Sequence, residues 1–300
     1  MANEPSASTD GLIWDQPPAN LRRPLLVAAF EGWNDAADAA TFAAGYLTQH
    51  GHSERIAHID PEAHTDFQAR RPQVELVDGV TRAIVWPEST FSVAHYPERD
   101  LVVLRGFEPS YRWRSFCRAV LDVYTATGCA MVVTFGALLA DVPHTRTVRV
   151  TGTATDPELI DRLSLEASQY EGPTGIVGVL HDMCREQGIP SVSLWAPVPH
   201  YIASPPNPPA SAAILDRFGR LTSIGLDLSR VQGTVERWRE QVNQVAADDD
   251  DIRSYVERLE ARYDESAADD ETPDWGHELP TADELATELE QFLRDQRGGD

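Results

Sequence analysis

The sequence predicts a three-layer α/β domain, in which helices cover both faces of a mostly parallel central sheet. Three observations predict this class. Short apolar runs recur along the first two-thirds of the chain, helix patterns separate them, and short turns join the two. A chain of 300 residues with 42% hydrophobic side chains is long enough to bury such a core without disulfides or a structural metal.

Apolar runs locate the expected strands. Residues 25–30 form a continuous apolar run, which is typical of a strand buried on both faces, and residues 130–135 are expected to form a central buried strand. Asp78-Gly79 between two short runs predicts a tight hairpin. The expected strands are residues 25–30, 55–59, 74–77, 81–86, 100–105, 130–135, 147–153 and 191–195.

Three helices are expected between these strands, at residues 35–48, 111–127 and 177–187. The first begins at an Asn34/Asp35 cap and is rich in alanine, which allows close approach to a sheet. The second carries Trp113, Phe116 and Val120 on one stripe, as an amphipathic helix does.

The C-terminal part differs from the rest in charge and periodicity. Residues 248–300 hold 19 acids and 5 arginines. Apolar residues at 231–245 and 252–263 share one helical phase, and the acidic run 248–251 interrupts it, so we expect two helices. Residues 267–280 are expected to form a linker and residues 281–292 a short capped helix. We therefore divide the chain into an N-terminal arm (1–24), an α/β core (25–226) with a hairpin insertion near 73–96, and an acidic helical extension (227–300), which is a candidate lid.

Charge composition excludes several functions. The formal net charge is −23, and all 25 basic residues are arginine. The absence of lysine excludes a Walker-type phosphate loop and a Schiff-base mechanism. Nucleic acid is not an expected partner, because phosphate binding needs a basic face.

Cysteine and histidine usage favours neither metal binding nor secretion. Cys117, Cys129 and Cys184 are odd in number and lack metal-ligand spacing, so we expect reduced thiols in a core. The histidines show no zinc spacing, and we expect no metal and no cofactor. The N-terminus lacks the pattern of a secretory signal and no apolar window is long enough to span a bilayer, so we expect a cytoplasmic protein without membrane contact.

Polar residues that follow the expected strands form the candidate pocket. In an open α/β sheet, ligands bind at the carboxyl ends of the strands, so these turns are the places to search. Asp141, His144 and Arg146 combine an acid, an imidazole and a guanidinium that could act in acid–base chemistry or bind a carboxylate. The full set is Glu31, Trp33, Asn34, Asp35, Glu108, Asp141, His144, Arg146, Glu171, Gly172, Thr174, His200, Tyr201 and Asn207.

Each of these turns also has a structural interpretation. Asn34 and Asp35 could simply cap a helix, and Glu108 before a proline is an ordinary helix start. The loop at 141–146 could be ordered by internal hydrogen bonds, and the glycines at 172–178 could serve only as turns. No nucleophile elbow accompanies these loops, so the sequence contains no complete catalytic signature.

Five ordered sequence blocks between residues 25 and 226 resemble the bacterial branch of the proteasome assembly chaperone 2 (PAC2) family. The blocks are residues 30–36 (FEGWNDA), 106–109 (GFEP), 136–146 (GALLADVPHTR), 170–175 (YEGPTG), and 199–201 (PHY) together with 205–208 (PPNP). The resemblance implies a core similar to nucleoside phosphorylases and related hydrolases. It also implies a hairpin insertion used in oligomers, expected to be trimers, and a helical lid over a ligand pocket. The C-terminal sequence QRGGD lacks the hydrophobic-tyrosine docking motif of some relatives.

Two functional hypotheses follow. The first is a homo-oligomeric protein of the assembly-chaperone type, which acts on a protein partner through contacts and not through turnover. The alternative is a hydrolase or phosphorylase-like enzyme, or a sensor, that binds a small polar ligand at the carboxyl ends of the sheet. A concave polar pocket favours the second hypothesis, and an exposed apolar patch favours the first.

Overall fold

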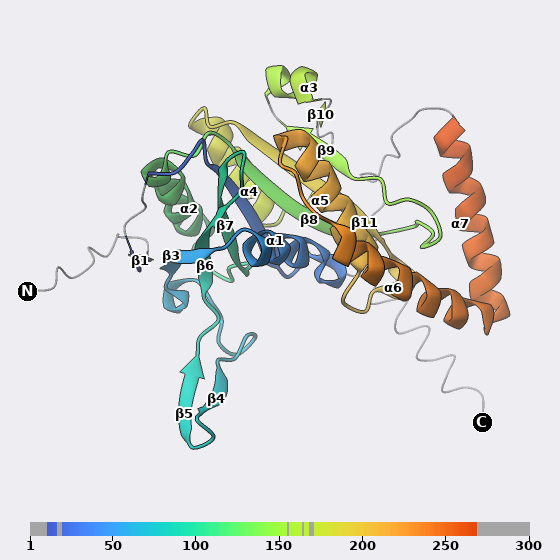
Figure 1. The fold of residues 1–300 in the computed structure, drawn as a ribbon, viewed down its shortest axis with the longest axis horizontal. Coiled ribbons are helices and arrows are strands. Elements are labelled where there is room, and N and C mark those ends of the chain that lie inside the picture. Colours follow the sequence, from blue (N-terminus) through green and yellow to red (C-terminus); the bar gives the residue numbers. More distant parts are fainter. Residues whose placement is uncertain (1–10, 17–19, 155, 164, 168–170, 269–300) are drawn as a thin grey trace, which may run out of the picture.

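A computed structural model describes residues 11–16, 20–154, 156–163, 165–167 and 171–268 (Figure 1). Its centre is a nine-stranded sheet with the order β1-β3-β6-β7-β2-β8-β11-β9-β10. The strands are β1 (Leu12–Trp14), β2 (Leu25–Glu31), β3 (Glu54–Ile59), β6 (Ser89–His95), β7 (Asp100–Phe107), β8 (Val132–Ala140), β9 (Thr151–Ala154), β10 (Glu166–Ala167) and β11 (Ser191–Pro199).

The four central strands, β7, β2, β8 and β11, are parallel. β6, β3 and β1 extend one edge in antiparallel fashion, and at the other edge β9 pairs antiparallel with β11 and parallel with β10. The parallel strands must be connected by crossovers, which place helices on the faces of the sheet. The carboxyl ends of β7, β2, β8 and β11 therefore lie at one edge, where the candidate pocket was predicted.

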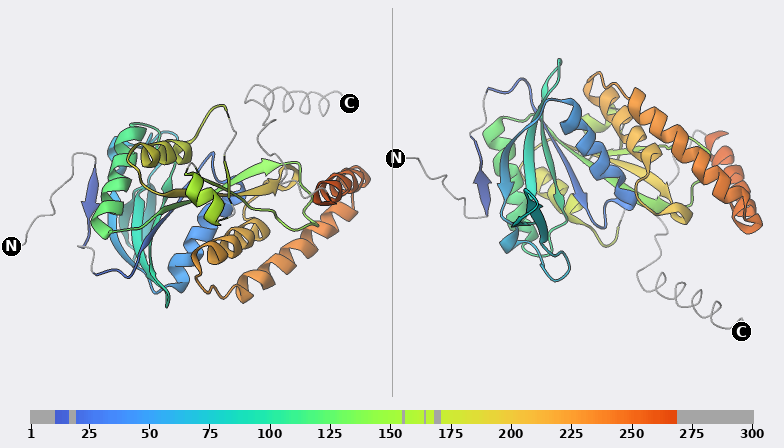
Figure 2. Two further views of the ribbon diagram at one scale, coloured as in Figure 1. Left: turned by 90° about the horizontal axis from the view of Figure 1, so that it is seen from above. Right: turned by 60° about the horizontal axis from the view of Figure 1, so that its bottom comes forward.

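Helices cover both faces, so the predicted three-layer class is confirmed (Figure 2). On one face α1 (Ala39–His50) and α5 (Pro208–Thr222) pack together and enclose one apolar cluster with the sheet. On the other face α2 (Trp113–Thr127) and α4 (Ile176–Glu186) enclose a second cluster. A short helix, α3 (Pro157–Leu163), lies between β9 and β10.

Close contact between β8 and β11 depends on a glycine. A Cβ atom at Gly136 would lie 2.6 Å from the indole of Trp195, which is opposite it in the parallel ladder. Without a side chain at Gly136, the tryptophan ring covers this part of β8. The glycine therefore allows Trp195 to lie against β8 within a ladder that pairs the two strands as far as Pro199 and Ala140.

The hairpin at Asp78-Gly79 forms a separate two-stranded sheet from β4 (Gln73–Val77) and β5 (Thr81–Val85). Asp78 and Gly79 have φ values of 54° and 73°, the positive region that a tight hairpin turn requires. The hairpin projects away from the body in Figure 1. It is shorter than the expected insertion of residues 73–96, because residues 89–95 form β6 in the central sheet.

Two long helices follow the core. α6 (Ser229–Ala247) packs Val231 and Val235 onto the α1/α5 side of the core, and α7 (Asp250–Ala268) buries Val256 and Leu259. The linker predicted at 267–280 falls mainly, and the helix predicted at 281–292 entirely, outside the described residues. No helix in the described part of the chain is both long and apolar enough to cross a membrane.

Candidate functional site

Some of the predicted site residues form two hydrogen-bonded groups along the carboxyl edge of the sheet. In the first group, the Glu108 carboxylate accepts hydrogen bonds from Asn34 Nδ2 (2.9 Å) and from the backbone N–H of Ile176 (2.8 Å). Ile176 is the first residue of α4, so Glu108 neutralises the positive end of that helix. A Cβ at Gly175 would lie 2.5 Å from Asn34 Oδ1, which explains the glycine at this position. The three loops are thus joined through Glu108, whose carboxylate already has protein partners.

Asp35 organises the start of α1. Its buried carboxylate accepts hydrogen bonds from the backbone N–H of Ala40 (2.7 Å) and Thr41 (3.3 Å) and from the Thr41 hydroxyl. Burial raises the pKa of Asp35 to about 6, although these hydrogen bonds oppose the shift. Ala37 and Asp38 adopt positive φ, so a short 3-10 turn (Ala36–Asp38) precedes the helix. These contacts are those of a helix-capping residue, the structural interpretation that the sequence offers for Asp35.

The remaining residues near this group lie at the surface. Glu31 forms an ion pair with Arg70 (3.1 Å), and the Arg70 guanidinium covers the Phe107 ring at 3.6 Å from its centroid. Trp33 is 58% exposed. The segment before α4 is also exposed; it contains the predicted residues Glu171, Gly172 and Thr174.

The second group is centred on His144, in the loop after β8. The backbone N–H of His144 donates to the Tyr201 hydroxyl (2.9 Å), and that hydroxyl also contacts His144 Nδ1 (2.7 Å). His144 Nε2 lies 2.9 Å from Asn243 Oδ1 on α6. An amide oxygen accepts only, so Nε2–H donates to Asn243 and the Tyr201 hydroxyl donates to Nδ1. Burial chiefly lowers the pKa of His144, which favours this neutral form.

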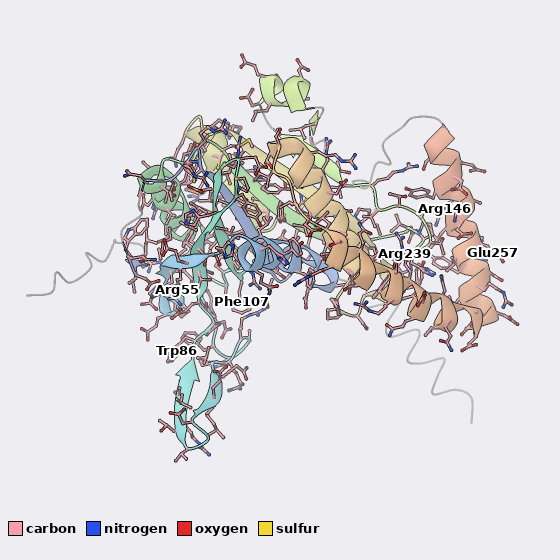
Figure 3. All side chains as sticks on the ribbon, viewed as in Figure 1. Arg55, Trp86, Phe107, Arg146, Arg239 and Glu257 are labelled. Carbon is pink, nitrogen blue, oxygen red and sulfur yellow. The ribbon has the colours of Figure 1, made fainter. Side chains whose placement is uncertain are left out.

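The loop that contains His144 also contacts α7 through Arg146, which is labelled in Figure 3. Arg146 forms two parallel hydrogen bonds of 2.8 Å to the Asp264 carboxylate and a third of 3.0 Å to Glu260. Asp141 contacts His200 Nδ1 (3.0 Å) and the Tyr255 hydroxyl (3.3 Å). The second group thus connects the loop after β8 and the turn after β11 to the C-terminal helices.

A narrow cavity lies beside this second group, with a volume of about 10 Å³. His144 and Asn207 are the predicted residues that line it. Its lining comprises Val142, Pro143, His144, Thr147, Val148, Arg149, Pro197, Pro199, Asn207, Pro209, Trp238 and Tyr263. In the part of the chain that the structure describes, no group of three or more His, Cys, Asp or Glu side chains is arranged to hold a metal ion.

Sequence reasoning missed the residues of the C-terminal helices in this site. Asn243, Glu260 and Asp264 lie on the polar faces of α6 and α7, where apolar periodicity gives no information about partners. The apolar residues of both segments recur with one helical phase, and this pattern predicts the two helices. It does not predict which residues their polar side chains contact.

Comparisons with known proteins agree with this architecture. The model of the PAC2 family matches residues 29–246. A PAC2 family protein from Streptomyces avermitilis is 46% identical over 78% of this chain and 99% of its own, with a TM-score of 0.74. A proteasome-assembly chaperone homologue from Mycobacterium tuberculosis is 42% identical over 77% of this chain and 99% of its own, with a TM-score of 0.71.

A more distant structure, an archaeal proteasome activator from Pyrococcus furiosus, is 17% identical over 78% of this chain and 97% of its own. Its TM-score of 0.62 shows a shared fold. None of the curated proteins matches the chain. The family model covers most of the sequence and includes all five of the sequence blocks, and two bacterial structures exceed 40% identity. The chain belongs to the PAC2 family.

Proposed function

We propose that this protein acts as an assembly-chaperone-type protein, which works through protein–protein contacts as a homotrimer and assists proteasome assembly. The observation that carries the proposal is the β4–β5 hairpin, whose apolar side chains face solvent in the single chain. Val74, Leu76 and Ile84 are 61%, 63% and 58% exposed. The similarity to the M. tuberculosis proteasome-assembly chaperone homologue supports proteasome subunits as the partner.

The register of the hairpin places these three side chains on one face. Val74 pairs with Ile84 and Leu76 pairs with Arg82, so the side chains of these four residues lie together. Covering one such aliphatic side chain is worth about 1.5–3 kcal/mol, whereas a two-stranded hairpin without further packing is marginally stable. Contact with another copy would stabilise the hairpin and remove this apolar face from water.

Charge also favours the hairpin as the point of contact between copies. The chain has a net charge of −23, so most surfaces of two copies repel each other. Residues 73–86 contain two acids and one arginine, a net charge of −1. We place the protein in the cytoplasm, because its three cysteines are unpaired and buried, as is usual in a reducing compartment.

Analytical ultracentrifugation tests the oligomer. We expect a species of three 33.2 kDa chains at micromolar concentration. The triple variant Val74→Thr/Leu76→Thr/Ile84→Thr keeps or raises β-propensity at most of these positions but removes the apolar face, so it should sediment as a monomer. The control Val77→Thr/Val85→Thr changes the opposite face and should remain trimeric. A monomeric wild type, or equal behaviour of both variants, would refute the hairpin contact.

The chaperone role needs a separate experiment. Proteasome subunits from the same cell, mixed with the purified chain, should assemble faster than subunits alone, and native electrophoresis measures the rate. The monomeric triple variant should assist assembly less than the Val77→Thr/Val85→Thr control. Assembly that proceeds at the same rate with and without the chain would contradict the proposed role, whatever the oligomeric state.

A further inference from the structure

A second, larger cleft lies at the amino ends of β2 and β7, at the edge of the sheet opposite the candidate site. Its volume is about 480 Å³, which is within the range of pockets that accommodate small organic molecules. Four segments form it: the residues before β2, the end of α1, the turn between β6 and β7, and the connection from α5 to α6. Three of its lining residues are the histidines His50, His52 and His95. The backbone N–H of His95 donates to the Gly51 carbonyl, so these three residues lie close together.

Two of the histidine rings present an unprotonated nitrogen. His50 Nδ1 lies 3.0 Å from the carbonyl oxygen of Tyr46, and His95 Nδ1 lies 3.0 Å from Asp100 Oδ1. Carbonyl and carboxylate oxygens only accept, so each Nδ1 carries the hydrogen and, in the neutral ring, each Nε2 has a lone pair. Neither Nε2 atom has a hydrogen-bond partner among the described residues. Both rings therefore supply an open acceptor.

Most of the donors that line the cleft are already used by protein oxygens. The hydroxyl groups of Tyr46 and Tyr96 each donate to a backbone carbonyl. Arg22 donates to two backbone carbonyls and forms an ion pair of 2.8 Å with the buried Asp100, which balances its charge. A ligand that fits this lining must therefore bring hydrogens of its own to donate.

The local charge favours a cation. α1 ends at His50 in the wall of the cleft, so the negative end of its helix dipole lies there. Asp227 also lines the cleft, and its hydrogen bonds to Ser229 chiefly lower the pKa of its carboxyl group, which is therefore ionised. Arg230 attracts this carboxylate but forms no ion pair with it in the described part of the chain. The carboxylate thus has no cation in direct contact.

We propose that this cleft binds the primary ammonium group of a small organic amine. An ammonium group has three N–H donors and no acceptor, which matches the open acceptors of His50, His95 and Asp227. Leu226 and Pro97 line the cleft as apolar contacts for the alkyl part of the amine. Imidazole nitrogens also bind metal ions, but among the described residues no three His, Cys, Asp or Glu side chains are arranged to hold one. The proposal concerns the single chain and does not depend on the proposed chaperone function.

Isothermal titration calorimetry of the intact protein with n-butylammonium chloride tests the proposal at pH 8, where imidazoles are neutral and the amine is protonated. Sodium butyrate and tetramethylammonium chloride at equal ionic strength are the reference ligands. Butylammonium should bind in a saturable manner. Butyrate has the opposite charge, and tetramethylammonium has the charge without an N–H donor. Each should bind at least about tenfold more weakly, the equivalent of a lost hydrogen bond to a charged group.

Two variants test the position of the site. Asp227→Asn removes the charge but keeps the oxygen that accepts the Ser229 N–H, so it should raise the Kd for butylammonium at least about threefold, within the range of an exposed charge pair. His50→Phe keeps a ring that can stack on Tyr46 but removes the acceptor, and it should raise the Kd to a similar extent. The control Asp182→Asn makes the same charge change at an exposed position on α4 and should leave the Kd unchanged.

The outcomes separate the ligand assignment from the site. Equal binding of butyrate or tetramethylammonium would refute the ammonium assignment. Butylammonium binding that Asp182→Asn weakens as much as Asp227→Asn would reduce the effect to the net charge of the protein and refute the site. Binding that neither Asp227→Asn nor His50→Phe weakens, or no saturable binding at all, would also overturn it.

Discussion

His181 on α4 provides a test of how the layers of the fold respond to pH. Its Nε2 lies 2.8 Å from Thr134 Oγ1 on β8, and its Nδ1 lies 2.8 Å from Ser191 Oγ on β11. Thr134 donates its own hydrogen to Ser193 (2.9 Å), so it accepts from Nε2–H. In the neutral ring, Ser191 then donates to Nδ1. A second proton on the ring has no acceptor unless Ser191 turns its hydroxyl away.

Burial lowers the pKa of His181 from the usual 6.5 to about 4. A lowered histidine pKa means that the folded state resists protonation while the unfolded chain does not. The contribution to stability is therefore complete above pH 6.5 and is lost as the pH falls from 6.5 towards 4. A shift of this size corresponds to about 3 kcal/mol. The residue keeps some contact with solvent, so we expect a loss of about 2 kcal/mol by pH 4.5.

Urea denaturation of the wild type and of His181→Gln, at pH values from 7 to 4.5, measures this effect. Glutamine can still donate to Thr134 but does not titrate, so at pH 7 the variant should lose only about 1 kcal/mol of unfolding free energy. The difference in unfolding free energy should then change by about 2 kcal/mol as the pH falls, so that His181→Gln becomes about 1 kcal/mol more stable than the wild type at pH 4.5.

Protonation of Asp35 has the opposite effect on stability. It contributes equally to the wild type and to His181→Gln, so it does not change the difference between their unfolding free energies. Its raised pKa of about 6 means that protonation stabilises the fold as the pH falls through this value, and both proteins contain it. A difference between wild type and His181→Gln that stays constant within 0.5 kcal/mol, about the precision of such measurements, would refute the role assigned to His181.

Three further predictions concern other parts of the fold. Arg146→Ala removes the contacts to Glu260 and Asp264, so amide hydrogen exchange in α7 should accelerate while the central strands keep their protection. Gly136→Ala places a Cβ 2.6 Å from the ring of Trp195 and should lower the unfolding free energy by about 1–3 kcal/mol in urea titrations. Burial raises the pKa of the Cys184 thiol to about 12, so a thiol reagent such as Ellman's should not modify it at pH 8 until the protein unfolds.

The layers of the fold could be predicted because they follow from local composition. β2 and β8 are predominantly apolar, and this composition indicates burial on both faces of the sheet. α5 and β6 were not predicted. A run as rich in proline as residues 205–209 favours a loop, but Pro208 and Pro209 occupy the first turn of α5, where a missing N–H costs little. In β6, buried and partly buried positions alternate without a strong apolar run.

The sequence predicts where the candidate site lies, but not which of its residues contact one another. Topology alone brings the turns after parallel strands to one edge, and this was available from the sequence. The partners of Glu108 were not, because Asn34 and Ile176 lie 74 and 68 residues away and no periodicity links them. The start of α1 also depends on distant residues, since the backbone N–H of Asn207 donates to the Ala37 carbonyl at 3.1 Å.

The C-terminal helices are attached to the core in two different ways, and this difference has a consequence for their response to salt. α6 is anchored by buried Val231 and Val235 within the α1/α5 cluster, whereas contacts between α7 and the loop after β8 are largely hydrogen bonds and ion pairs, such as that of Arg146. Polar contacts at a surface exchange readily with water and weaken with salt, while a packed apolar interface does not. We therefore expect added salt to weaken the contacts between α7 and the loop after β8, while the buried Val256 and Leu259 of α7 and the packed interface of α6 keep their protection. Amide hydrogen exchange at low and high salt measures this difference, and equal changes in the two helices would contradict it.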